Sequence, residues 1–234
     1  GSGESGKPWL LYTPGDFARY LDGFLSALDL QRVVLVGHSL GGHIALSYAL
    51  AHPERVERMV LVAPAYSVFR QIAMTRAELL LALAAIPFLG NLIMALAPCR
   101  FVRWFIGQPW GGLYRPERLS RECLDRLAGD FTERSTPLLS NTLVYLTVFA
   151  LPGLSRLRRD ADLWPRLPDV RVPTLVIWGQ HDALLRSSSY PSLVERIAGA
   201  QRRLIPEAGH SPMVEAPQEF GRILITFLEG SPVN

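Results

Sequence analysis

One serine stands in a pattern that could turn its hydroxyl into a nucleophile. Ser39 lies in the run Gly37-His38-Ser39-Leu40-Gly41, which matches G-x-S-x-G. Between a strand and a helix, this pattern forms a sharp turn with a strained serine backbone, where side chains in place of Gly37 and Gly41 would not fit. The turn would project the Ser39 hydroxyl above a sheet, at the start of a helix. The N–H of Leu40 could then stabilise a developing oxyanion.

A serine hydroxyl is a poor nucleophile unless a base removes its proton, and the base needs an acid to orient it. His210 and Asp182 are suited to these roles because each follows a predicted strand. Open α/β sheets place their sites at the carboxyl ends of the strands. The order serine, aspartate, histidine along the chain is the one expected for this turn. We therefore predict Ser39 as nucleophile, His210 as general base and acid, and Asp182 as the residue that orients His210.

Other histidines and aspartates compete for these roles less well. His38 precedes the nucleophile and is expected to pack under the turn; the remaining histidines, on helices or beside Asp182, are His43, His52 and His181. Asp162 and Asp169 are weaker candidates for the acid of the site, because neither closely follows a predicted strand. The position after the second predicted strand is closed to an acid, because the chain there reads Pro64-Ala65.

Strand and helix patterns alternate in both end regions of the chain. Apolar, β-branched runs predict strands over residues 32–37, 59–63, 174–179 and 203–205, and helical spacing predicts helices over 13–28, 40–51, 191–198 and around 220–228. Thr13 is expected to cap the first helix, followed by Pro14 and Asp16. Strands without polar alternation are typical of a parallel sheet covered on both faces. The predicted class is α/β, with about four parallel strands joined by right-handed crossovers.

The middle of the chain lacks strand patterns and is predicted to be an inserted helical cap. The cap spans residues 66–165, and residues 1–65 and 166–234 form the core. Within the cap, residues 79–97 are almost entirely apolar and approach the length of a membrane span. Because a proline, a glycine and an asparagine interrupt this run at Pro87, Gly90 and Asn91, two short cap helices are the preferred interpretation.

The composition indicates a folded globular protein. Of its 234 residues, 49% are hydrophobic and 19% are charged, which is too apolar for an intrinsically disordered chain. The formal net charge of +3 comes from basic residues scattered among acidic ones, so nucleic-acid binding is not expected. Cys99 and Cys123 lack metal-ligand spacing and are predicted to be buried free thiols. The polar opening residues do not resemble a signal peptide.

Three stretches together resemble the α/β-hydrolase fold, in the capped branch that includes esterases, lipases and carbon–carbon bond hydrolases. They are GHSLGG around Ser39, the strand continuing into WGQHD around Asp182, and AGHSPMVEAP around His210. The resemblance extends over nearly the whole chain and is weakest across the predicted cap. It implies a serine hydrolase with these three residues in the roles given above. Haloalkane dehalogenases and typical epoxide hydrolases would instead require an aspartate at position 39.

The resemblance also implies strands that this sequence does not contain. Its opening residues, GSGESGKP, resemble a family loop that follows the fourth strand. We therefore expect a truncated portion of an enzyme, in which the strand before Ser39 is an open, aggregation-prone edge. The family's second oxyanion donor comes from a loop after the third strand, and one donor contributes about 3–4 kcal/mol to transition-state stabilisation. Poor activity of the chain alone is the expected consequence.

The predicted cap favours an apolar substrate. Aromatic residues and a further apolar run enrich it, at Phe101, Trp104, Phe105, Trp110 and 143–151. Such a surface lines a hydrophobic tunnel, or forms an interfacial face with Arg100 and Arg103 near lipid headgroups.

The expected activity is therefore hydrolysis of a small, lipophilic carboxylic ester through an acyl-enzyme, without a cofactor or metal. Two alternatives stay open: hydrolysis of a carbon–carbon bond, thioester or lactone by the same residues, and a catalytically silent fragment. Peripheral membrane contact through the cap is a further expectation, and the cytoplasm is the default compartment.

Overall fold

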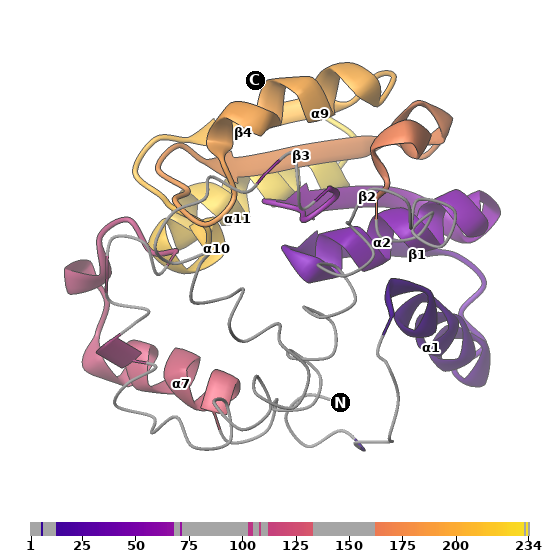
Figure 1. Ribbon diagram of the computed structural model, residues 1–234. Coiled ribbons are helices and arrows are strands. Elements are labelled where there is room, and N and C mark those ends of the chain that lie inside the picture. Colours follow the sequence, from indigo (N-terminus) through magenta and orange to yellow (C-terminus); the bar gives the residue numbers. More distant parts are fainter. Residues whose placement is uncertain are drawn as a thin grey trace, which may run out of the picture.

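The computed structural model describes residues 6, 13–67, 71, 103–104, 108, 112–132, 162–231 and 233. Its strands form one parallel sheet in the order β1-β2-β3-β4, with helices on both faces (Figure 1). The strands are β1 (Val33–His38), β2 (Val56–Val62), β3 (Thr174–Gly179) and β4 (Gln201–Ile205). The α-helices are α1 (Pro14–Ala27), α2 (Leu40–Ala51), α7 (Arg121–Thr132), α9 (Tyr190–Arg196), α10 (Pro212–Glu215) and α11 (Pro217–Leu228). Short 3₁₀ turns are η1 (Pro53–Arg55), η2 (Pro116–Arg118), η4 (Trp164–Asp169) and η5 (Ser187–Ser189). The predicted α/β class is confirmed, and the described residues contain four parallel strands.

Helix α1 begins at the expected cap. The Thr13 hydroxyl accepts from the Asp16 N–H at 3.1 Å, and the Asp16 carboxylate accepts from the Thr13 N–H at 2.9 Å. This reciprocal pair satisfies two backbone N–H groups that have no acceptor within the helix. The predicted apolar face is only partly covered, because Leu25 is buried toward the core while Tyr20, Phe24 and Leu28 are more than half exposed.

Strand β1 differs from the expectation of a strand buried on both faces. Val33 and Leu35 pack against the core that α1, α2 and α9 cover. On the opposite face Val34 and Val36 are 39% and 50% exposed. Helix α11 packs there against residues of β2, β3 and β4, and β1 is not part of that cluster. Among the described residues, β1 pairs only with β2, so it forms one edge of the sheet.

The two ends of the predicted cap lie together. Ser67 and Asp162 form an isolated antiparallel bridge, and the Leu163 N–H donates to the Tyr66 carbonyl at 3.0 Å. Helix α7, from the predicted cap, lies away from the sheet (Figure 1). The cap boundaries themselves stay a prediction.

Several expectations for the cap fall on residues that the structure does not describe. These are the two helices within 79–97, the apolar residues 101, 105, 110 and 143–151, and Arg100 and Cys99. Cys123 is described; it is a free thiol but only partly buried, because it lies on the half-exposed helix α7. In the described part of the chain, no helix is both long enough and apolar enough to cross a bilayer.

Candidate active site

The turn between β1 and α2 holds Ser39 in a strained conformation. Its φ of 53° and ψ of −117° lie in a region that L-residues rarely adopt, at a cost of about 1–3 kcal/mol. The surrounding backbone fixes the turn: the Ser39 N–H donates to the Val62 carbonyl at 2.9 Å, and the Ser39 carbonyl accepts from the Ala65 N–H at 3.0 Å. Leu40 is the first residue of α2, so its N–H has no acceptor one helical turn earlier.

The glycines of this turn do not all have the role that the sequence suggests. A Cβ added to Gly37 would lie 2.4 Å from the Gly41 carbonyl oxygen, and one on Gly42 would lie 2.6 Å from the Pro64 side chain. A Cβ on Gly41 would meet no described atom within 4 Å. Among the described residues, nothing therefore excludes a side chain at position 41. A glycine is required at position 37 because the backbone of Gly41 lies so close, and at position 42 because Pro64 packs against it.

His210 and Asp182 are brought together from two strand ends. Asp182 follows β3 and His210 follows β4, and His210 Nδ1 lies 2.8 Å from Asp182 Oδ2. The carboxylate accepts, so Nδ1 carries the proton and Nε2 is left with its lone pair. The other carboxylate oxygen of Asp182 accepts from the N–H groups of Leu184 and Leu185, both at 2.9 Å. These bonds fix the carboxylate, whose side chain is fully buried.

His38 links the serine turn to His210. Its Nε2 lies 2.8 Å from the His210 carbonyl oxygen, so the nitrogen must be the donor, and the two rings lie 4.8 Å apart between centroids. His210 thus lies beside the residue that precedes Ser39. Ser39 and His210 are both described, and no hydrogen bond joins the Ser39 hydroxyl to the His210 imidazole. Such catalytic hydrogen bonds often tighten only when substrate is bound. From its position in the sequence, His38 was expected only to pack under the turn, and its bond to the His210 carbonyl was not predicted.

Burial, reinforced by the neighbouring His210, lowers the pKa of His38 from its ordinary value to about 4. Between about pH 6.5 and pH 4 the unfolded chain then binds more protons than the folded chain, so stability falls as the pH falls through this window. The full effect is at most about 3 kcal/mol. Urea unfolding at pH 7 and pH 4.5 should show a smaller loss of stability for His38→Gln than for wild type. Equal losses in the two proteins would contradict this assignment.

The competing histidines and acids either have other partners or lie exposed. His43 is fully buried and its Nδ1 lies 2.6 Å from the Ala65 carbonyl oxygen, while His52 ends α2 with its ring against Tyr48. His181 stacks on Tyr114, with ring centroids 3.7 Å apart. Asp162 accepts from the Trp164 N–H, and Asp169 lies exposed at the end of η4. Within the described residues, no group of three potential ligand side chains is arranged to hold a metal ion.

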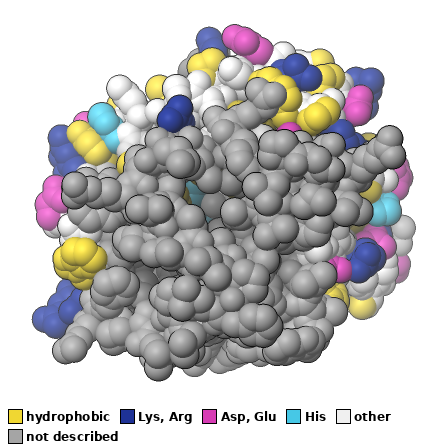
Figure 2. Space-filling model, in the orientation of Figure 1, with side chains coloured by type: hydrophobic (Ala, Val, Ile, Leu, Met, Phe, Trp, Pro, Cys, Tyr) yellow, Lys and Arg dark blue, Asp and Glu magenta, His cyan; other side chains and the backbone are white. Residues whose placement is uncertain are grey.

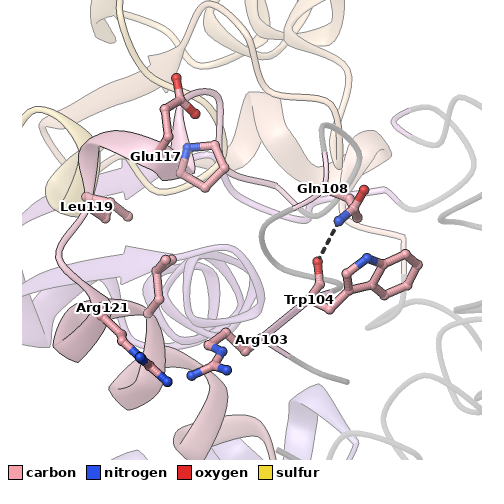
Figure 3. Close-up of a pocket in the computed structure, with 8 residues that line it drawn as sticks. Arg103, Trp104, Gln108, Glu117, Leu119 and Arg121 are labelled. Atoms are coloured by element: carbon pink, nitrogen blue, oxygen red, sulfur yellow. Dashed lines mark hydrogen bonds between the residues drawn. The ribbon is translucent and has the colours of Figure 1, made fainter. Parts of the chain in front are cut away.

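A separate hollow lies in the predicted cap. It is open to the surface and has a volume of about 510 Å³. It is lined by an apolar group with two arginines (Figure 3): Trp104, Pro116, Leu119 and Leu124 with Arg103 and Arg121, alongside Gln108 and Glu117. Arg103, which was expected near lipid headgroups, pairs with Asp125 at 2.5 Å. None of the predicted catalytic residues lines this hollow. Around the rim of the face in Figure 2, the described basic and acidic side chains are interspersed.

The fold is that of the alpha/beta hydrolases. The model of the alpha/beta hydrolase fold family matches residues 1–217, and the chain belongs to that family. It is similar to the 2-hydroxy-6-oxo-6-phenylhexa-2,4-dienoate hydrolase of Comamonas testosteroni, with 30% identity over 214 residues, covering 90% of this chain and 68% of that protein.

Further comparisons agree. The 2-hydroxy-6-oxononadienedioate/2-hydroxy-6-oxononatrienedioate hydrolase of Paraburkholderia xenovorans (strain LB400) is 28% identical, over 90% of this chain and 67% of that protein. A hydrolase from Pseudomonas aeruginosa PA01 superposes with a TM-score of 0.73 at 25% identity, over 97% of this chain and 76% of that structure. The protein is therefore a hydrolase of this family.

Proposed function

We propose that this protein is a serine hydrolase that cleaves a lipophilic carboxylic ester, with Ser39, His210 and Asp182 as its catalytic residues. The observation that carries the proposal is the buried hydrogen bond between His210 Nδ1 and Asp182 Oδ2, beside a strained Ser39 turn. With Nδ1–H directed at the carboxylate, the Nε2 lone pair is available to accept the Ser39 proton.

The chemical steps follow from these roles. His210 Nε2 takes the proton of the Ser39 hydroxyl as Oγ attacks the ester carbonyl carbon, and the resulting oxyanion accepts a hydrogen bond from the Leu40 N–H. When the intermediate collapses, the carbon–oxygen bond breaks and His210 gives its proton to the departing alcohol. His210 then removes a proton from water, the hydroxide attacks the acyl carbon, and the carboxylic acid leaves as Ser39 Oγ regains a proton.

Hydrolysis of a carbon–carbon bond in a vinylogous diketone is a second candidate. The observation in its favour is a set of relatives at 28–30% identity. They are named as hydrolases of 2-hydroxy-6-oxo-6-phenylhexa-2,4-dienoate, or of 2-hydroxy-6-oxononadienedioate and 2-hydroxy-6-oxononatrienedioate. Ser39, His210 and Asp182 would serve here too, because both reactions need a base, oriented by an acid, that activates the serine or a water molecule. A thioester or lactone substrate would need no change in the residues either.

A fluorophosphonate probe tests the proposal directly. The folded protein should gain one probe mass on Ser39, and Ser39→Ala should gain none, because only an activated serine attacks such a probe. Circular dichroism of both samples establishes that they are folded. A folded wild-type protein that stays unlabelled would contradict the proposal and favour a catalytically silent protein.

Substrate panels separate the candidates. p-Nitrophenyl esters of increasing acyl length should give a rising kcat/KM, because longer chains bury more apolar surface. A preference for the acetate would overturn the lipophilic assignment. Faster turnover of a 2-hydroxy-6-oxo-6-phenyl dienoate than of every ester would favour the second candidate.

A further inference from the structure

Hydrogen bonds hold the backbone on both sides of His210. The His210 N–H donates to the Gly112 carbonyl at 2.6 Å, and the His210 carbonyl accepts from His38. The N–H groups of the two neighbouring residues, Gly209 and Ser211, both donate to Glu215 Oε1, at 2.9 and 3.3 Å. One carboxylate therefore holds both sides of the histidine.

The same carboxylate also reaches residues 112–118, which we call the 112–118 segment. Glu215 Oε2 accepts from the Tyr114 N–H at 2.6 Å. This segment packs on the loops that carry the site: Tyr114 stacks on His181, and Arg115 and Arg118 donate to Glu207 at 2.7 and 3.0 Å. Glu215 thus joins the loop after β4 to a segment of the predicted cap.

The two backbones that Glu215 joins lie in close contact. A Cβ added to Gly209 would lie 2.6 Å from the Gly112 carbonyl oxygen and 2.8 Å from the Tyr114 nitrogen. A Cβ on Gly112, whose φ is 98°, would lie 3.4 Å from the His210 Cβ. Because little free space separates the segments, a shift of the 112–118 segment would move the His210 backbone with it.

We propose that Glu215 is the positioning residue of His210: it holds the loop after β4 on the 112–118 segment, so that the imidazole keeps its bond to Asp182 and its place beside the Ser39 turn. Hydrogen bonds from backbone N–H groups to a carboxylate are stronger than those to a neutral acceptor. A shift of about 1 Å in a reacting group can lower a rate by about 10²-fold. The proposal rests on the function proposed above, because His210 needs such placement only if it transfers a proton.

Glu215→Gln tests this with little change in volume. If the amide oxygen replaces Oε1, the Gln NH₂ faces the Tyr114 N–H and two donors meet; if the amide is reversed, the bonds to Gly209 and Ser211 are lost. Either arrangement breaks one side of the link. The matched control is Glu229→Gln, an exposed glutamate at the end of α11.

The measurements are kcat and KM on the best ester, the rate of Ser39 labelling, the thermal midpoint, and the low-field NMR signal of the His210 Nδ1 proton. We expect Glu215→Gln to lower kcat and the labelling rate together, by about 10- to 100-fold, with KM changed less than threefold. The Nδ1 proton signal should shift or broaden, and Glu229→Gln should match wild type in every measurement.

Other outcomes overturn the proposal. An unchanged Nδ1 signal with kcat within twofold of wild type would do so, as would a loss of activity no larger than the loss of folded protein. If wild-type protein neither labels nor turns over esters, the proposed function fails separately. The Nδ1 signal of Glu215→Gln then decides the positioning role by itself, since it requires no turnover.

Discussion

Asp182→Asn is expected to lower kcat by about 10⁴-fold while the fold is kept. Asp182 Oδ1 accepts from the N–H groups of Leu184 and Leu185, so the oxygen of an asparagine would occupy that side. Its NH₂ group would then face His210 Nδ1. A donor there stabilises the opposite imidazole tautomer, with the proton on Nε2, and that tautomer cannot accept the Ser39 proton.

The measurement is kcat on the best ester, with circular dichroism and the thermal midpoint to establish folding. Asp169→Asn is the matched control, because Asp169 is exposed at the end of η4 and should leave kcat unchanged. A loss of less than tenfold in folded Asp182→Asn would show that the carboxylate does not orient the histidine.

Gly37→Ala should have the largest effect on stability. The new Cβ would lie 2.4 Å from the Gly41 carbonyl oxygen and 2.8 Å from the Gly42 Cα. Both are backbone atoms of the turn and of the first turn of α2, so neither can move aside as a flexible side chain would. We expect a loss of about 3 kcal/mol or more in the free energy of unfolding, which corresponds to a fall of roughly 6–12 °C in Tm for a chain of this size.

Gly41→Ala is the comparison that makes this result specific. It lies four residues away in the same motif, and its added Cβ meets no described atom within 4 Å. Because Gly41 is within α2, alanine should be neutral or slightly stabilising there, by up to about 1 kcal/mol. Thermal unfolding of the two variants side by side measures the difference. Similar midpoints for both would contradict the close approach at Gly37.

Local chemistry explains which elements could be predicted. The Thr13–Asp16 pair forms between residues three apart, so it is visible in the sequence before any packing is known. Helix α2 and strand β3 have the predicted bounds because their apolar patterns and end signals are local as well. The strand-turn-helix around Ser39 follows from the same patterns. The pairing of His210 with Asp182 was predicted from chain order and from the strand ends they follow, and the 2.8 Å contact agrees with it.

The α/β class, the order of the elements and the residue types at the strand ends can be read from the sequence, because hydrophobic periodicity and capping act over a few residues. Which of those residues contact one another depends on the packing of the whole chain. Exposure of Val34 and Val36 depends on how far α11 extends across the sheet. The bond of His38 to the His210 carbonyl, and that of Glu215 to the Tyr114 N–H, join residues 172 and 101 positions apart. No local pattern encodes contacts between residues so far apart in the chain, because these contacts depend on how the whole chain packs.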